Sequence, residues 1–228
     1  MTPPAKAGDA PETDRLGHAH VLAIAVPIIL ANVTTPLIGL VDTAVLGQLG
    51  DAHYIGAIAI GAMIFNLLYW AFGFLRMGTT GLTAQAEGGG DTLEIGATLM
   101  RALLIAVAVG LVLIILQLPI SAISFALLNG SPAVEASASA YFDIRIWGAP
   151  AALANFAFLG WFIGMGRART ALVLQLLLNG TNAILDAWFV LGLGLAVEGV
   201  AFATLISQLV AAAAGIWLSI SVLKRRGM

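Results

Sequence analysis

Two carboxylates interrupt long apolar stretches of the sequence. Asp42 lies within LIGLVDTAVLG, and Asp186 lies within NAILDAWFVLG. Acids at membrane depth are costly, so they usually face a cavity or a partner and mark a functional site. Each acid precedes the predicted outer end of its segment by about four or five residues, which corresponds to roughly 6–8 Å along a helix. We therefore expect the two acids to lie at one depth and to share a pocket.

Polar residues accompany Asp186 along its segment. Gln175, Asn179 and Asn182 precede it at steps of four, three and four residues. This spacing places all of them on one face of a helix. A polar stripe on an otherwise apolar helix points into a protein-lined cavity, although amides in membrane spans also bond one helix to another.

Other segments contribute polar residues at related depths. Asn32 lies on a line that leads to Asp42 in the first segment, and Thr204 enters the sixth segment at the depth of the acids. Asn155 lies deeper, in the middle of the fourth segment, and Arg145 is expected near that segment's outer end. We interpret Asn32 and Asn155, together with Gln175 and Asn179, as members of a polar network lining the cavity.

Two kinds of chemistry fit such residues. Carboxylate, amide and hydroxyl oxygens suit a hard cation such as Na⁺. Alternatively, burial of an acid favours its neutral form, so one of the acids could carry a proton. Pro27 and Pro36 interrupt the segment that holds Asp42. Proline removes a helical hydrogen bond, so Pro27 is either a fixed bend or a hinge.

The segments that must position these residues have the length of membrane spans. About 20 mostly apolar residues cross a bilayer as a helix, and six stretches qualify: 20–46, 54–75, 96–118, 142–165, 171–191 and 199–223. Lys and Arg are concentrated in the two termini and in every second connector, which all lie on one side of the membrane. Because positively charged segments stay on the cytoplasmic side, we expect cytoplasmic N- and C-termini in a plasma or inner membrane. Residues 1–17 are polar and rich in Pro and acids, so we expect a disordered cytoplasmic tail before a bundle over 18–228.

Composition agrees with lipid as the solvent. Of 228 residues, 60% are hydrophobic and 10% charged, with a mean hydropathy of +0.99, whereas soluble domains carry about 25% charged residues. A net charge of −2 gives no indication of a nucleic-acid partner, and the lack of cysteine excludes disulfides and thiolate chemistry. The sequence lacks H-E-x-x-H, G-x-S-x-G and the G-x-G-D of intramembrane aspartyl proteases, so we expect neither an enzyme nor a cofactor.

Two long stretches resemble the multidrug and toxin extrusion (MATE) transporters, especially their DinF-like prokaryotic branch. VPIILANVTTPLIGLVDTAVLGQLGDAHYIGAIAIG resembles the first helix and the following turn of that family. FLGWFIGMGRARTALVLQLLLNGTNAILDAWFVLGLGLAVEGVAFATLISQ resembles its fourth, fifth and sixth helices, including a G-x-G-R-x-R-like inner turn. The similarity covers nearly all of the chain after residue 18.

The resemblance implies an all-α membrane protein of twelve helices, with two six-helix lobes around a cleft that opens alternately to each side. It implies export of amphipathic, often cationic compounds by antiport with Na⁺ or H⁺. By this likeness Asp42, Asn182, Asp186 and Thr204 form the coupling site, and Pro27 lies where the first helix bends. The implied partners are membrane lipid, a small substrate and a second six-helix lobe.

The chain contains six spans, so we interpret it as the N-terminal lobe, with the other lobe in the same gene product or in a second chain. Two alternatives remain. A flippase for lipid-linked precursors should have a basic cavity for phosphates. A non-transporting scaffold bundle would have no need of two acids at matched depth.

Overall fold

The computed structural model describes residues 18–128 and 130–227, and within the first helix it describes only some side chains. The predicted tail over 1–17 lies outside these residues. The helices, in chain order, are α1 (His18–Gly47), α2 (Ala52–Trp70), α3 (Phe74–Gly88), α4 (Thr92–Ile115), α5 (Gln117–Leu128), α6 (Pro132–Arg145), α7 (Ala149–Gly164), α8 (Ala168–Asp186) and α9 (Val197–Arg225). A short 3₁₀ turn, Ile146–Gly148, joins α6 to α7, and a π-helical segment, Ala187–Gly192, extends α8.

These helices make up six spanning units. Five stretches among the described residues are long and apolar enough to cross a membrane: Ala52–Gly88, Thr92–Ile115, Pro132–Gly164, Ala168–Gly192 and Val197–Arg225. Helix α1, with 30 residues, occupies the predicted first span. Large apolar side chains such as Leu67, Trp70 and Leu118 are exposed over the bundle, as lipid contact requires. The predicted all-helical six-span membrane bundle is confirmed.

Three predicted boundaries were wrong. The second span continues through α3 to Gly88 rather than ending at Leu75, and the fourth begins at Pro132 rather than at Phe142. Residues 119–128, which fall between the predicted third and fourth spans, belong to α5, which is apolar but too short to span. Each boundary was wrong because polar residues were taken as the end of a span. Such residues can continue a helix where they contact other parts of the protein or lie at the edge of the bilayer.

Helix α7 is the centre of the bundle. It packs against α3, α4, α8 and α9, and most of its side chains are buried. Its glycines permit close approach: a Cβ at Gly160 would lie 2.5 Å from the Arg76 carbonyl oxygen, and one at Gly164 would lie 2.6 Å from that of Thr80. The two glycines therefore allow α7 to pack closely on α3, as small residues spaced four apart do in membrane helices.

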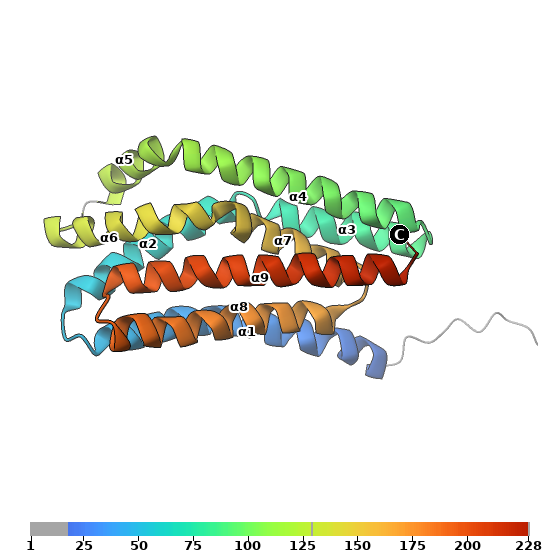
Figure 1. Cartoon of the computed structure of the whole chain (residues 1–228), viewed down its shortest axis with the longest axis horizontal. Coiled ribbons are helices and arrows are strands. Elements are labelled where there is room, and N and C mark those ends of the chain that lie inside the picture. Colours follow the sequence, from blue (N-terminus) through green and yellow to red (C-terminus); the bar gives the residue numbers. More distant parts are fainter. Residues whose placement is uncertain (1–17, 129, 228) are drawn as a thin grey trace, which may run out of the picture.

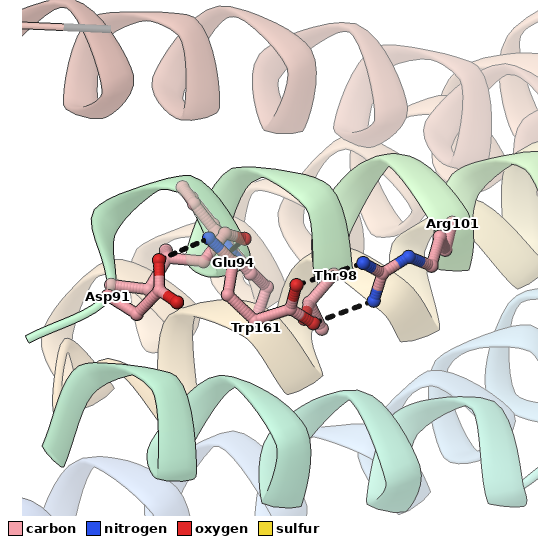
Figure 2. A network of polar contacts seen from close by, with 6 residues as sticks. Asp91, Glu94, Thr98, Arg101 and Trp161 are labelled. Atoms are coloured by element: carbon pink, nitrogen blue, oxygen red, sulfur yellow. Dashed lines mark hydrogen bonds and ion pairs between the residues drawn. The ribbon is translucent and has the colours of Figure 1, made fainter. Parts of the chain in front are cut away.

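The start of α4 is fixed by a polar cluster (Figure 2). The Asp91 carboxylate accepts from the Glu94 backbone N–H at 3.0 Å, which caps the helix. The Glu94 carboxylate accepts hydrogen bonds from both terminal nitrogens of Arg101, at 2.7 and 2.9 Å. The indole of Trp161 on α7 donates to the Ile95 carbonyl at 2.9 Å, so α4 and α7 are joined by a buried hydrogen bond.

Helix α1 lies at one side of the bundle and packs chiefly against α8, beside which it runs along the lower edge of Figure 1. The helix is continuous from His18 to Gly47, through Pro27 and Pro36. Pro27 is buried. The two prolines therefore do not break α1 in this conformation.

Candidate functional site

A polar cavity of about 340 Å³ lies among α1, α2, α6, α8 and α9. Its lining consists of Gly39, Asp42, Ala62, Asn66, Tyr141, Arg145, Leu178, Asn182, Thr204, Ser207 and Gln208. Five different helices contribute, so the site exists only when the bundle is assembled. Two other hollows, lined chiefly by α2, α4 and α5 and by α3 and α4, are almost entirely apolar.

The two predicted acids meet at this cavity. Asp42 lies five residues before the end of α1, and Asp186 is the last residue of α8. Because α1 packs along α8, the two carboxyl groups adjoin each other. Asp42 is 6% exposed and Asp186 is 0% exposed. Asp42 lines the cavity, and Asp186 adjoins Asp42 without being part of the lining.

Asn182 and Thr204 complete the polar wall. Asn182 lies one helical turn before Asp186, and its Nδ2 donates to Thr204 Oγ1 on α9 at 3.4 Å. The Ser207 hydroxyl donates to the Thr204 carbonyl at 2.8 Å, which keeps this turn of α9 polar. The structure thus brings Asp42, Asn182 and Thr204 onto one cavity, as their depths predicted.

Three other residues of the predicted network, Gln175, Asn179 and Asn155, are not part of the cavity lining. Gln175 Nε2 donates to Asn179 Oδ1 at 2.9 Å, one turn along α8 and outside the cavity lining. Asn155 is buried on α7, and its Nδ2 donates to the backbone carbonyl of Gln208 at 3.0 Å. These three residues therefore lie outside the cavity lining. The side chain of Asn32 lies outside the described residues.

Arg145 lines the cavity, although the sequence analysis did not include it among the site residues. It was expected near the outer end of the fourth span, but that span begins at Pro132, so Arg145 lies well inside it and lines the cavity. It is close enough to Asp42 and Asp186 for their charges to interact. Its terminal nitrogen donates to the Tyr141 hydroxyl, one turn earlier on α6. A correct start for the fourth span would have identified it as an intramembrane charge.

The backbone beside the acids is irregular. The six residues that follow Asp186, Ala187–Gly192, form a π-helical segment. Such segments are rare and occur often at functional sites, because they widen the helix and redirect side chains. No sequence pattern in the ILDAWFVLG stretch pointed to this feature.

The oxygens at this site fit a hard monovalent cation or a proton. Several buried oxygens have no hydrogen-bond partner: Asp42 Oδ1, Asn182 Oδ1, and both Asp186 Oδ1 and Oδ2. Buried acceptors are normally paired, so a cluster of unpaired ones points to a missing positive group. Among the described residues no three His, Cys, Asp or Glu side chains gather as a metal cluster. A cation would therefore depend on the amide and hydroxyl oxygens of Asn182 and Thr204 as well.

A lipid-facing bundle of six helices around a charged internal cavity has the architecture of a membrane transporter domain. The model of the MatE family matches residues 27–188, and the chain belongs to that family. Over 205 residues it is 40% identical to DNA damage-inducible protein F of Escherichia coli, covering 90% of this chain and 45% of that protein. The resemblance noted in the sequence is confirmed.

Further relatives agree on the class. Multidrug export protein MepA of Staphylococcus aureus is 24% identical over 192 residues, covering 84% of this chain and 43% of that protein. A solved MOP superfamily transporter from Pyrococcus furiosus superposes with a TM-score of 0.77 at 22% identity, covering 86% of this chain and 43% of that chain. At that identity the superposition establishes the fold alone. The chain spans about half the length of these relatives, and the family is one of transporters rather than enzymes.

Proposed function

We propose that this chain is the N-terminal lobe of a cation-coupled exporter that moves amphipathic, often cationic compounds out of the cell by antiport. The observation that carries the proposal is the joint burial of Asp42 and Asp186 beside a cavity, with unpaired oxygens on both acids and on Asn182. Unpaired anionic groups at membrane depth are retained where a cation or proton neutralises them during function.

In this proposal Asp42, Asn182, Asp186 and Thr204 form the coupling site. The residues come from α1, α8 and α9, so a bound Na⁺ or H⁺ acts on the contacts among three helices. An ion changes a conformational equilibrium only through its different affinity for the two states. Neutralisation of the acid pair removes repulsion between α1 and α8, and this favours the conformation in which the two helices are packed as here.

Pro27 is the proposed hinge of α1. Proline lacks the N–H that would bond to the preceding turn, so bending costs less there than elsewhere in the helix. Helix α1 packs chiefly against α8, so its movement would disturb few other contacts. The acid pair lies on the α1–α8 contact, which connects its charge to the position of α1.

The rest of the assignment concerns the complete assembly. We propose a location in the cell membrane with cytoplasmic termini, since Lys224, Arg225 and Arg226 gather at the end of α9. A second six-helix lobe would face the cavity and close the transport path. The reading frame after Met228 tests this part, because a second six-span block there is the expected result.

Asp42→Asn tests the coupling site. The protein, with its second lobe where the gene encodes one, is reconstituted in vesicles under an imposed Na⁺ or H⁺ gradient, and export of a cationic dye is followed. Asp42→Asn keeps the shape but removes the charge, and we expect coupled export to fall at least about tenfold. Asp143→Asn is the matched control, because Asp143 is an exposed acid outside the cavity. Normal export by Asp42→Asn would disprove the assignment.

The flippase alternative requires a basic cavity. Arg145 supplies one cationic group to the lining, but Asp42 lines the same cavity and Asp186 adjoins it, so acids outnumber bases. This balance favours a substrate with a cationic part over a phosphate-rich headgroup.

A further inference from the structure

Arg145 is a fixed positive charge inside the fourth span, and it is not one of the four proposed coupling residues. It is the last residue of α6, and it lines the same cavity as Asp42, which has the opposite charge. An arginine at this depth is costly, and such residues almost always have a partner that marks their function.

The protein holds the guanidinium in place without neutralising it. The group lies over the Phe65 ring at 4.6 Å, and one terminal nitrogen donates to the Tyr141 hydroxyl. Both contacts are with uncharged groups. The buried Nε atom of Arg145 has no hydrogen-bond partner at all.

The nearby acids are not bound to Arg145. Across the part of the chain that the structure describes, no ion pair within 4.0 Å includes its guanidinium, although Asp42 and Asp186 are near enough to interact through space. Phe65 and Tyr141, which contact the guanidinium, are almost fully buried, at 0% and 1% exposure. The cavity therefore has a positive pole and a negative pole that do not cancel by contact.

Each pole has unmet hydrogen-bonding capacity. Arg145 Nε is an unpaired donor, while Asp42 Oδ1 and Asn182 Oδ1 are unpaired acceptors. A purely cationic ligand would satisfy the acceptors and leave the donor unmet. A ligand with a cationic group and a carboxylate would satisfy both, because a guanidinium offers a planar edge that matches a carboxylate with two parallel hydrogen bonds.

We propose that Arg145 is a substrate-selecting residue, and that the cavity takes zwitterionic amphiphiles whose carboxylate binds Arg145 while their cationic group faces Asp42. This inference rests on the proposed export function and specifies its substrate class. The apolar part of the ligand would lie against Ala62 and Leu178, the apolar members of the lining.

Tetramethylrhodamine and its methyl ester form a matched pair of probes. The free acid is a zwitterion, and the ester is a cation of nearly the same shape. Affinity of the detergent-purified protein for each dye is measured by fluorescence polarisation. A charge-assisted hydrogen bond is worth enough for Arg145→Gln to weaken binding of the free acid about tenfold or more. The ester should change by less than about threefold.

Two further variants control the result. Arg145→Lys keeps the charge but loses the planar edge, so it should weaken free-acid binding by less than Arg145→Gln does. Arg101→Gln removes an arginine that pairs with Glu94 outside the cavity, and it should leave both affinities unchanged. Size-exclusion chromatography establishes that each variant is folded. If Arg145→Gln is not folded, Arg145→Lys is compared with the wild-type protein, and it should weaken binding of the free acid more than binding of the ester.

Each remaining outcome overturns the inference. An equal loss for both dyes would make Arg145 a structural or coupling residue, and an unchanged preference would show that no carboxylate binds there. Failure of the wild-type protein to bind the free acid while it binds the ester would also refute it. Binding of neither dye, together with no gradient-driven export of the ester, would refute the export function itself.

Discussion

The contact between α3 and α7 allows a stability prediction with a calculable cause. A Cβ at Gly160 would lie 2.5 Å from the Arg76 carbonyl oxygen, and ordinary contact begins at 3.4 Å, so Gly160→Ala must separate the two backbones by about 0.9 Å. Overpacking of this kind costs about 1–3 kcal/mol. Alanine also gains roughly 1 kcal/mol over glycine from helix propensity, which partly offsets the clash.

A second glycine isolates the clash from the propensity gain. A Cβ at Gly180, on α8, would meet nothing within 4 Å, so Gly180→Ala should gain the propensity term alone. The difference between Gly160→Ala and Gly180→Ala is therefore the clash, about 1–3 kcal/mol. At about 2–4 °C per kcal/mol for a chain of this size, the two midpoints of thermal unfolding in detergent should differ by roughly 2–12 °C.

The assay follows loss of helical circular dichroism, or loss of the monodisperse peak in size-exclusion chromatography, as temperature rises. Helix α7 also carries Asn155, which donates to the Gln208 backbone beside the cavity, so the shift of α7 should reduce dye binding as well. Equal midpoints for the two alanine variants would refute the close packing of α3 on α7.

Three further substitutions test contacts that position the bundle. Trp161→Phe removes the indole N–H that bonds to the Ile95 carbonyl, which keeps its bond within α4, and should lower the free energy of unfolding by about 0.5–1.5 kcal/mol, measured by chemical denaturation in detergent. Glu87→Gln removes a bidentate pair with Arg226, at 2.7 and 2.8 Å, that ties α3 to the end of α9; we expect a loss of about 1 kcal/mol that shrinks in high salt. Asp91→Ala removes the N-cap of α4 and should cost about 0.5–2 kcal/mol, with hydrogen exchange rising first in the opening turn of that helix.

Much of the fold follows from the sequence because lipid imposes a simple rule. Every backbone polar group in the bilayer must be bonded within the chain, so long apolar runs can only be helices, and their number is readable from hydropathy. The positions of Asp42 and Asp186 within their runs were enough to predict that they share a depth. The N-cap at Asp91 is likewise a local feature, since it involves only the neighbouring turn.

Helix boundaries and the identity of the cavity's residues did not follow in the same way. The polar start of the fourth span, PAVEASASAYFDIR, is helical because α2 and α9 pack against it, and those neighbours lie far away in the chain. That packing carries Arg145 from its predicted interfacial position into the cavity. Conversely, Gln175 and Asn179 share a helical face with Asn182, yet they bond to each other outside the cavity lining.

The sequence by itself therefore determined the membrane class, the six spans, the family and the two acids at one depth. Only the tertiary structure decided that Asp42 adjoins Asp186, that Thr204 bonds Asn182, and that Arg145 faces them. The physical reason is that hydropathy and helical period fix where a residue lies along a helix and on which face. They do not fix which helices are neighbours, and a site assembled from five helices depends on that choice.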